Sequence, residues 1–479
     1  MFILKLLKKV LKATNTSWDS TMTIIETAKC ILKEGPVCDP CLGRQFGKLS
    51  TGLTNAQRGF AIKTEMSMQA AADGDRETQQ LLAPAFAQAR KVLGIEGQDE
   101  ECWLCRGLFQ NPENIQKWAD RCIESVSGYE HDTLLVGTKV PPIYSEKEEV
   151  IWAECGVAHA EPLKAELNRE VGKAVSQKTG KEVDFKRPDV VFTIDLAADR
   201  VVPKINSLFI YGRYNKYVRD IPQTRWPCRE CGGKGKKGEA ECEHCKGTGK
   251  MYPTSVEEQI NHEVIDEFKA GDAILHGAGR EDIDGRMLGD GRPFVMEVIN
   301  PRVRWVDLDA LRERINAYAS EKVAVSGLHY VDKDSVEQVK SIKPDKTYRL
   351  KVIYNDDISI ETLKSSLATL SNSTILQRTP VRVSHRRADL ERKRKVHSIT
   401  LGELNEADKY FTITVRCEGG LYVKELVSGD NGRTSPSLSA LLNRQARVTE
   451  LDVMNVEGGI SWQDHMVKEK RPGTSSQRR

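Results

Sequence analysis

Residues 276–294 read HGAGREDIDGRMLGDGRPF, a loop that places carboxylates among arginines and glycines. Along it lie the carboxylates of Glu281, Asp282 and Asp284 and the guanidinium groups of Arg280, Arg286 and Arg292. Its glycines lack the Walker A spacing, and no G-x-G-x-x-G motif opens a helix after a strand, so the loop is not a nucleotide-phosphate cradle. A carboxylate near basic groups stays ionised at neutral pH and can act as a nucleophile or a base. The residues alone therefore indicate either a catalytic carboxylate or a salt-bridged surface turn.

The segments on both sides of this loop predict an α+β fold. A capping box formed by Ser255 and Glu258 starts a helix that Gly271 ends, and alternating apolar residues from Val190 to Ile194 predict a strand. A second helix is expected at 308–318, and further strands at 208–211, 293–299, 347–354, 411–417 and 421–427. Helices mixed with hairpin-like strands predict an antiparallel or mixed sheet.

Composition bounds the possible classes of protein. The chain has 479 residues, of which 39% are hydrophobic and 29% charged, as in a globular protein with about three domains. No apolar run approaches the roughly 20 residues that cross a bilayer, so we expect no membrane segment. The net charge of +3 does not by itself indicate a nucleic-acid partner.

Eight of the twelve cysteines form four C-x-x-C pairs. The pairs are Cys38/Cys41, Cys102/Cys105, Cys228/Cys231 and Cys242/Cys245. Because a C-x-x-C turn supplies two thiolates to a tetrahedral zinc ion, the last two pairs predict one zinc knuckle, with four free thiols as the alternative. The first two pairs are far apart in sequence and are expected to share a second zinc, with buried thiols as the alternative. Four thiolates leave no open position for a substrate, so both zincs would be structural, and the remaining four cysteines are expected to be ordinary thiols.

Two basic segments qualify the low net charge. Residues 378–396 contain eight Arg or Lys and two acids, and residues 213–219 interleave bases with tyrosines. Arginine and aromatic side chains suit phosphate contacts and stacking on unpaired bases. The alternative is a solvated charged surface; beside the zinc knuckle, these segments favour RNA.

Several longer stretches resemble one family. They are GRED at 279–282 with GRPF at 291–294, GRYNKYVRDIPQTRWPC at 212–228, MYPTSVEE at 251–258, QRTPVRVSHRRADL at 377–390 and GLYVKELVSGD at 420–430. Together they are similar to the archaeal tRNA pseudouridine-54/55 synthases, which carry a THUMP domain. The resemblance covers most of residues 22–460.

The resemblance implies roles for particular residues. Asp282 aligns with the catalytic aspartate, Tyr348 with the active-site tyrosine that packs against the target base, and Lys424 with a basic residue that holds the aspartate. It further implies RNA contacts for Tyr348, Tyr422, Arg280, Arg378, Arg382, Arg386 and Arg387. Cys38, Cys41, Cys102 and Cys105 match the zinc site of the family's N-terminal part.

The implied activity is that of an isomerase without a catalytic cofactor. Conversion of uridines 54 and 55 in the T-arm loop of tRNA breaks the C1′–N1 bond and joins C1′ to C5, with no redox change. Asp282 either attacks covalently or removes a ribose proton, after the base has been flipped into the pocket. The expected partner is tRNA, including its acceptor end, and the expected location is the cytoplasm.

The resemblance also predicts how the chain is divided. We expect an extension at 1–21, a zinc-containing THUMP-type domain at 22–217, a zinc-knuckle junction at 218–250, a catalytic domain at 251–465 and a disordered tail at 466–479. Residues 1–21 are basic and amphipathic without a signal-peptide cleavage site; the alternatives are a presequence, a surface helix, or an extension upstream of a true start at Met22. The alternative function is a non-catalytic or differently acting tRNA-binding protein with THUMP and zinc modules.

Overall fold

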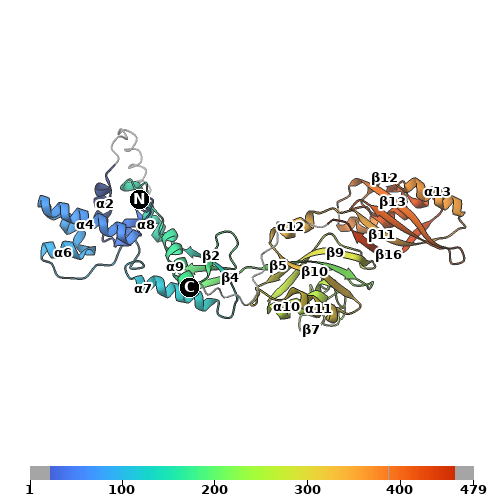
Figure 1. Cartoon of the computed structure of the whole chain (residues 1–479), viewed down its shortest axis with the longest axis horizontal. Coiled ribbons are helices and arrows are strands. Elements are labelled where there is room, and N and C mark those ends of the chain that lie inside the picture. Colours follow the sequence, from blue (N-terminus) through green and yellow to red (C-terminus); the bar gives the residue numbers. More distant parts are fainter. Residues whose placement is uncertain (1–21, 387, 459–479) are drawn as a thin grey trace, which may run out of the picture. The chain divides into compact units, whose positions relative to one another are not determined.

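The computed structural model describes residues 22–386 and 388–458 (Figure 1). The chain divides into unit 1, which ends at Asn206, and unit 2, which begins at Ser207. The predicted boundary lies later, at residue 217, because sequence analysis assigned the strand that follows Ser207 to the first domain. That strand, β5 (Leu208–Lys216), pairs with strands of unit 2. The extension expected at 1–21 and the tail expected at 466–479 lie outside the described residues.

Unit 1 begins with helices packed around buried cysteines and apolar side chains. The first is α2, which starts at a capping box formed by Thr23 and Glu26, and α4 starts at another formed by Thr54 and Gln57. The helices of this unit are α2 (Ile24–Lys33), α3 (Asp39–Arg44), α4 (Asn55–Asp73), α5 (Arg76–Leu82), η2 (Ala83–Ala85), α6 (Ala87–Leu93), α7 (Pro112–Ser125), α8 (Pro142–Glu154) and α9 (Leu163–Thr179).

The second half of unit 1 contains a small sheet with the strand order β2-β1-β3-β4. Its strands are β1 (Thr133–Lys139), β2 (Glu182–Val183), β3 (Val190–Asp195) and β4 (Arg200–Ile205). The strand predicted from the alternation of Val190, Phe192 and Ile194 is confirmed as β3, and these three side chains are fully buried. β1 pairs in parallel with β2 and β3, and α7 and α9 pack against the sheet.

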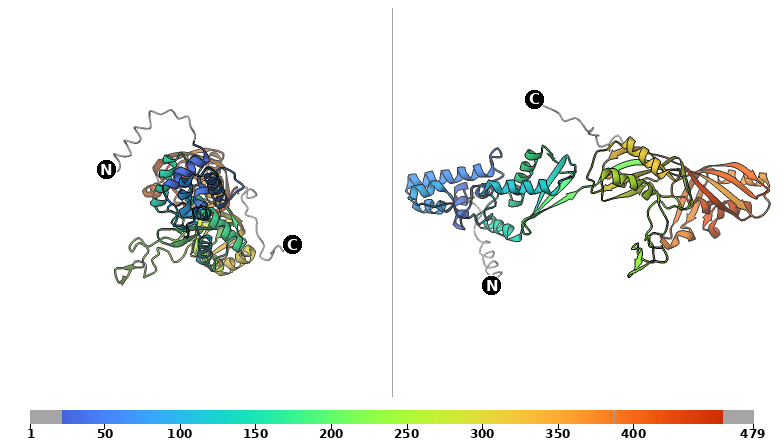
Figure 2. Two further views of the ribbon diagram at one scale, coloured as in Figure 1. Left: turned by 90° about the vertical axis from the view of Figure 1, so that its left-hand side faces the viewer. Right: turned by 90° about the horizontal axis from the view of Figure 1, so that it is seen from below.

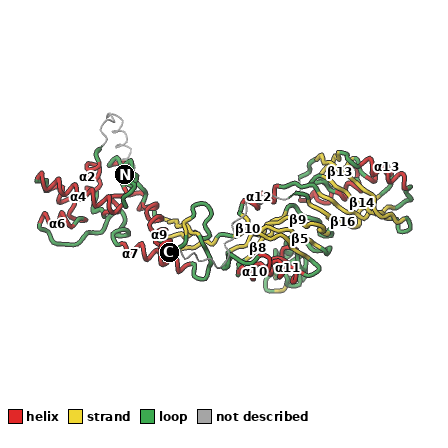
Figure 3. The backbone as a smooth tube through the Cα atoms, in the orientation of Figure 1, coloured by secondary structure: helices red, strands yellow, loops and turns green. Residues whose placement is uncertain are grey.

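The described part of unit 2 is built on one ten-stranded sheet (Figure 3). The strand order is β10-β5-β9-β16-β11-β14-β13-β12-β15, and β8 pairs with β9. These strands, with β5 given above, are β8 (Asp272–Gly277), β9 (Arg286–Ile299), β10 (Val323–Val331), β11 (Lys346–Tyr354), β12 (Thr374–Arg378), β13 (Glu391–Asn405), β14 (Tyr410–Cys417), β15 (Thr434–Ser435) and β16 (Ala446–Val456).

Helices cover both faces of the half of this sheet that contains β5 and β9. Alternate side chains of β5 enter two separate apolar clusters, with Leu208 and Ile210 in one and Phe209 and Tyr211 in the other. The helical elements of unit 2 are α10 (Val256–Phe268), α11 (Leu308–Ala319), α12 (Asp334–Ser341), α13 (Ile360–Leu370), η3 (Val381–Arg386), α14 (Val423–Ser428), η4 (Asp430–Gly432) and α15 (Leu438–Leu442). α10 and α11 contribute to the first cluster, and α12 contributes Val339 to the second.

One parallel pair joins the two halves of the sheet. β16 runs parallel to β9 over Arg286 and Met287, whereas the neighbouring pairs in this sheet are antiparallel. Gly289 has a φ of +58°, and a Cβ there would lie 1.9 Å from the carbonyl oxygen of Met454. Only glycine therefore allows β9 to approach β16 this closely. The loop that carries Asp282 leads directly into this junction.

The predicted α+β fold with a mixed sheet is confirmed, and so are most of its elements. The capped helix is α10, the helix expected at 308–318 is α11, and the strands expected at 293–299, 347–354 and 411–417 lie in β9, β11 and β14. The strand expected at 421–427 is wrong, because residues 423–428 form α14. Val423, Leu426 and Val427 are buried there at helical spacing, which the short apolar run did not distinguish from a strand.

The cysteine-rich segment between Cys228 and Cys245 forms a small hairpin that projects from unit 2 (Figure 2). Its strands are β6 (Lys236–Lys237) and β7 (Ala240–Glu241). Within the described residues, no helix has the length and apolar character needed to cross a membrane.

Candidate catalytic pocket and metal sites

A cavity of about 730 Å³ opens beside the loop that joins β8 to β9 in unit 2. Its size lies within the range of about 300–1,000 Å³ that is usual for sites that enclose a small molecule. It is lined by six of the predicted site residues, namely Arg280, Asp282, Tyr348, Arg382, Tyr422 and Lys424. They come from four different parts of the chain that only the sheet of unit 2 brings together.

Two cations flank the carboxylate of Asp282. Nη1 of Arg382 lies 3.1 Å from Oδ2 of Asp282, and Nζ of Lys424 lies 3.4 Å from the same oxygen. Lys424 also lies 2.8 Å from Oδ2 of Asp284, so one ammonium group bridges two carboxylates of the loop. Although burial opposes it, the hydrogen bond from Lys424 lowers the pKa of Asp284. The arrangement places the Asp282 carboxylate between two cations at the edge of a recessed cavity.

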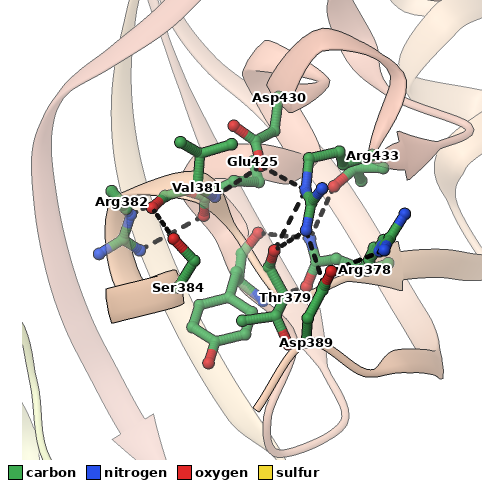
Figure 4. A network of polar contacts seen from close by, with 12 residues as sticks. Arg378, Thr379, Val381, Arg382, Ser384, Asp389, Glu425, Asp430 and Arg433 are labelled. Atoms are coloured by element: carbon green, nitrogen blue, oxygen red, sulfur yellow. Dashed lines mark hydrogen bonds and ion pairs between the residues drawn. The ribbon is translucent and has the colours of Figure 1, made fainter. Parts of the chain in front are cut away.

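Glu425 holds Arg382 in place (Figure 4). Nε of Arg382 donates to Oε1 of Glu425 at 2.6 Å, and Nη2 donates to Oε2 at 3.3 Å. The Glu425 side chain is only 6% exposed and does not line the cavity. Although burial opposes it, the hydrogen bond and charge of Glu425 raise the pKa of Arg382. A buried carboxylate thus aims the guanidinium group that contacts Asp282.

Arg378 belongs to a neighbouring network outside the cavity (Figure 4). Its guanidinium group pairs with Asp389 at 2.7 Å, and Arg433 pairs with the same carboxylate at 2.7 Å. Arg433 also donates to the carbonyl oxygen of Thr379. The side chain of Arg386 and all of Arg387 lie outside the described structure, so their predicted RNA contacts remain predictions.

A buried ion pair anchors the loop that joins β8 to β9. Nε of Arg292 lies 2.8 Å from Oε2 of Glu281, and the two side chains are 1% and 0% exposed. The Tyr214 hydroxyl donates to Glu281 at 2.9 Å. Nζ of Lys216 donates to the carbonyl oxygen of Ile283 at 3.0 Å and so anchors the segment after Asp282. Glu281, a rival to Asp282 in the sequence, is therefore enclosed as a structural anchor.

Tyr348 differs from the other residues on its face of β11. Leu350, Val352 and Tyr354 are buried in the core, whereas Tyr348 lines the cavity. Burial raises the pKa of the Tyr348 phenol well above its usual range, so the hydroxyl stays neutral. Because alternate residues of a strand share one face, sequence periodicity alone does not distinguish Tyr348 from these three core residues.

Tyr422 and Lys424 reach the cavity by a route that differs from the predicted one. They were expected on one face of a strand, but Tyr422 is the residue before α14 and Lys424 lies in its first turn. The Tyr422 ring lies beneath Arg382, with 5.8 Å between the guanidinium carbon and the ring centroid. The Gly419–Gly420 turn directs both side chains into the cavity.

Five further charged residues of this site were not singled out from the sequence. They are Glu425 and the cavity-lining Lys343, Lys346, Arg392 and Arg394. Arg392 and Arg394 were counted in the basic segment at 378–396, and their alternate spacing in a strand would have placed them on one face. No comparable signal marks Glu425.

The first four cysteines of the C-x-x-C pairs converge in unit 1. Cys38, Cys41, Cys102 and Cys105 are buried, and their sulfurs lie within 4.8 Å of one another. Zn–S bonds of ~2.3 Å in a tetrahedron separate sulfurs by about 3.8 Å, and Sγ of Cys38 lies 3.8 Å from Sγ of Cys105. These residues fit a zinc ion that would crosslink the helices of unit 1.

The second cluster closes the hairpin in unit 2. Cys228, Cys231, Cys242 and Cys245 are buried, and the sulfurs of Cys231 and Cys245 lie 3.8 Å apart. The backbone N–H groups of Gly235 and Gly249 donate to the sulfurs of Cys231 and Cys245, as is common around thiolate ligands. Both clusters therefore fit structural zinc with no position left for a substrate.

The remaining cysteines do not behave alike. Cys30 and Cys155 form a disulfide with a Cα–Cα separation of 5.6 Å, so the expectation of four ordinary thiols is wrong for this pair. They are 125 residues apart, and only the packing of unit 1 brings them together. Cys122 and Cys417 are free and buried.

The fold and the pocket define a class before any relative is considered. A mixed sheet carries an acidic loop at its parallel junction, with a tyrosine and two cations around one carboxylate, and the arrangement matches the pattern expected for pseudouridine synthases. The family described as "Pus10, C-terminal" matches residues 209–457, and "Pus10 THUMP domain, archaeal" matches residues 118–195. The chain therefore belongs to the Pus10 family of pseudouridine synthases and is an isomerase.

Several archaeal proteins named tRNA pseudouridine synthase Pus10 are similar to the chain over most of its length. The protein of Methanothrix thermoacetophila is 50% identical over 438 residues, which cover 91% of this chain and 95% of the relative. The protein of Halorubrum lacusprofundi is 45% identical and covers 91% and 97%. The protein of Methanocaldococcus jannaschii is 42% identical and covers 89% and 93%. The similarity spans both units.

A solved Cbf5–Nop10–Gar1 complex also contains a chain with a limited similarity. It is 15% identical, with a TM-score of 0.27, and the match covers 42% of this chain and 45% of that chain. The similarity at this level carries no conclusion about the site.

Proposed function

We propose that this protein converts uridines 54 and 55 in the T-arm loop of tRNA to pseudouridine, with Asp282 as the catalytic carboxylate. The observation that carries the proposal is the position of Asp282 at a cavity beside Tyr348, between Arg382 and Lys424. Family membership supports the reaction, and the printed names of the relatives support tRNA as the substrate. Since tRNA is modified where it is made and used, we expect the enzyme to act in the cytoplasm.

The reaction exchanges one glycosidic bond for another within one nucleotide. The C1′–N1 bond breaks, the uracil turns, C1′ bonds to C5, the C5 proton leaves and N1 gains a proton. Asp282 either attacks covalently or removes a ribose proton, and both routes need an ionised carboxylate in contact with the substrate. Arg382 and Lys424 hold that carboxylate at the cavity. Atoms and electrons balance without a redox partner, so no cofactor is required for the chemistry.

Tyr348 is proposed to pack against the flipped uracil. Because its phenol has a raised pKa, it can donate a hydrogen bond but is a poor proton acceptor at neutral pH. Arg280 and Tyr422 line the same cavity and are proposed to contact the nucleotide. Flipping a base costs a few kcal/mol, which these contacts help to offset.

Unit 1 is proposed to bind tRNA, including its acceptor end, through its THUMP sheet. The connection from β2 to β3 presents Phe185, which is 82% exposed, beside Lys186 and Arg187. Oδ1 of Asp184 accepts hydrogen bonds from the backbone N–H groups of Lys186 and Arg187, at 2.7 and 3.0 Å, and so shapes this turn. An exposed ring beside two basic residues suits stacking on an unpaired base.

The test is pseudouridine mapping on an unmodified tRNA transcript. Wild-type protein should modify both T-loop uridines, and Asp282→Asn should abolish modification at both. Asp290→Asn is the matched control, because Asp290 lies on the same segment but does not line the cavity. Wild-type protein that binds tRNA without modifying it would support the alternative of a non-catalytic tRNA-binding protein. An active Asp282→Asn variant would reject the proposed site.

A further inference from the structure

Four basic residues line the catalytic pocket but have no part in holding Asp282. They are Lys343, Lys346, Arg392 and Arg394, and we refer to them as the basic wall. Four cations this close together are normally accompanied by acidic side chains.

The basic wall lies where three neighbouring strands meet. Lys346 begins β11 and pairs in register with Cys417 of β14, which in turn pairs with Val396 of β13. Arg394 and Arg392 precede Val396 at alternate positions of β13 and therefore point to the same face. The intervening Lys393 and Lys395 do not line the pocket.

The basic wall has no counter-charge within the described chain. None of its members forms an ion pair with a described residue. Nη1 of Arg392 donates to Oγ1 of Thr379 at 2.9 Å, and Nη1 of Arg394 donates to the carbonyl oxygen of Lys393 at 2.7 Å. Nε of Arg394 is buried and has no acceptor among the described residues. A buried donor without an acceptor is costly, so Arg394 is suited to a ligand that brings its own acceptor.

Two glycines keep the space around Arg394 open. Gly420 has a φ of +95°, and a Cβ there would lie 3.2 Å from Nε of Arg394. A Cβ on Gly419 would lie 2.6 Å from the carbonyl oxygen of Pro344. The glycines therefore let the turn after β14 pass close to Lys343 and Arg394 without filling the pocket.

The pKa of Lys346 also suits the binding of an anion. Burial, and to a smaller extent the nearby charge of Arg292, lower this pKa to about 8, against the opposing effects of Cys417 and Glu281. A bound anion would favour the charged ammonium group and raise the pKa again. At neutral pH most of the lysine is protonated and able to bind such an anion.

We propose that the basic wall binds the phosphodiester backbone of the RNA strand next to the target uridine. This inference rests on the proposed function, since it assigns a further part of the same substrate. The sheet order places β13 four strands from β9, which corresponds to about 19 Å at ~4.8 Å per strand. The wall thus runs from Lys346, whose Nζ would lie 3.5 Å from a Cβ on Gly279 in the Asp282 loop, to Arg392 and Arg394 on β13. Its β13 end therefore suits the flanking chain rather than the reacting base. Paired cations that each present several donors match phosphate oxygens.

The main test uses Arg394→Gln in the full-length protein, with Lys393→Gln as the matched control. Both changes remove one positive charge from β13, but only Arg394 faces the pocket. We expect Arg394→Gln to raise the Kd for unmodified tRNA roughly tenfold and to reduce the slope of log Kd against log salt by about 0.7, the value for one phosphate of a single strand. At saturating tRNA, kcat should stay within about threefold of wild type. Equal effects of the two variants on Kd and slope would overturn the proposal.

A second variant and a modified substrate identify the ligand. Lys343 lies in an exposed loop. If Arg394→Gln fails to fold, Lys343→Gln should raise the Kd and reduce the salt slope in the same direction. A T-arm stem-loop with a neutral methylphosphonate linkage beside the target uridine should bind wild-type protein more weakly. It should bind the Arg394→Gln and Lys343→Gln variants no more weakly than the natural RNA does. Equal sensitivity of wild type and both variants at each flanking linkage would show that the wall does not bind this backbone.

The two levels of proposal can fail separately. Absence of pseudouridine in wild-type reactions would reject the proposed function. Normal wild-type activity, together with Arg394→Gln and Lys343→Gln variants that bind tRNA as the Lys393→Gln control does, would reject only the basic wall.

Discussion

Glu425 is expected to support catalysis without contacting the substrate. Its carboxylate accepts two hydrogen bonds from Arg382, whose Nη1 lies 3.1 Å from Asp282. Glu425→Gln removes the charge that aims this guanidinium group and leaves the volume of the side chain nearly unchanged. Arg382 is then free to leave Asp282 and to turn toward solvent.

The expected fall in kcat of Glu425→Gln follows from the loss of the charge-assisted contact between Glu425 and Arg382. A hydrogen bond to a charged group contributes about 1.5–3 kcal/mol, and the Arg382 side chain is 36% exposed, so solvent screening favours the lower end. A loss of about 1.4 kcal/mol corresponds to a tenfold change in rate. We therefore expect kcat to fall about tenfold. KM should change by less than about threefold, because Glu425 does not line the pocket.

The assay is single- and multiple-turnover pseudouridine formation on a tRNA transcript, with Glu457→Gln as the control. Glu457 also forms a two-point pair with an arginine, Arg416, at 2.6 and 2.8 Å, but neither residue lines the pocket. Thermal unfolding of each variant reports whether the fold is retained. Arg382→Gln and the Glu425→Gln/Arg382→Gln double variant complete a mutant cycle.

Two outcomes would refute this role of Glu425. One is an unchanged kcat in Glu425→Gln while the protein remains folded. The other is a double variant whose loss equals the product of the single losses, since residues that act through one contact are not additive. A double variant no slower than Arg382→Gln is the expected result.

Three further perturbations probe other parts of unit 2. Arg292→Met should lower the free energy of unfolding of the unit by about 3–5 kcal/mol, because the buried Glu281 loses the arginine it pairs with. The Arg292→Met/Glu281→Gln double variant should recover most of this loss in denaturant unfolding, and no recovery would contradict the pairing. The pKa of Lys346 is lowered to about 8 by burial and by Arg292, so the charge of this lysine is lost as pH rises through that value. Between about pH 7 and about pH 9, tRNA affinity should therefore fall about tenfold, because one charge-assisted contact of about 1.5 kcal/mol is lost. Lys346→Arg should abolish this pH dependence, and an equal fall in the variant would exclude Lys346 as its source. Cys242→Ser should reduce the zinc content by one equivalent per chain, while Cys122→Ser leaves it at two, and metal analysis that finds equal contents would reject the ligand assignment.

The catalytic elements differ in how far the sequence could predict them. GRED at 279–282 identified one acidic residue among several only through the family resemblance, since Glu281, Asp282 and Asp284 are equivalent by composition. The structure separates their surroundings, because the Glu281 side chain is 0% exposed and paired with Arg292, whereas the Asp282 side chain is 31% exposed and lines the cavity. Tyr348 shows the same limit, since it shares its apolar stripe with three core residues. Only the structure shows that this side chain, near the start of β11, lines the cavity.

Sequence patterns predicted a helix or a strand correctly where the interactions that stabilise it lie within a few residues. The N-cap of α10, where the Ser255 hydroxyl accepts from the Glu258 N–H, and the alternation in β3 act within a few residues, and both elements are confirmed. The segment at 421–427 was assigned to a strand because a short apolar run fits both periodicities, and only its packing in unit 2 selected the helix α14.

By itself, the sequence determined the α+β class, the family and the cysteine pairs, because each rests on residue types and short spacings. The tertiary structure decided which distant groups meet: Glu425 behind Arg382, the four cysteines of unit 1, the Cys30–Cys155 disulfide and the unpaired cations of the basic wall. The reason is physical. Ion pairs, metal sites and pockets depend on distances of a few ångströms between segments that the chain separates by tens to hundreds of residues, and those distances are set by strand order and packing.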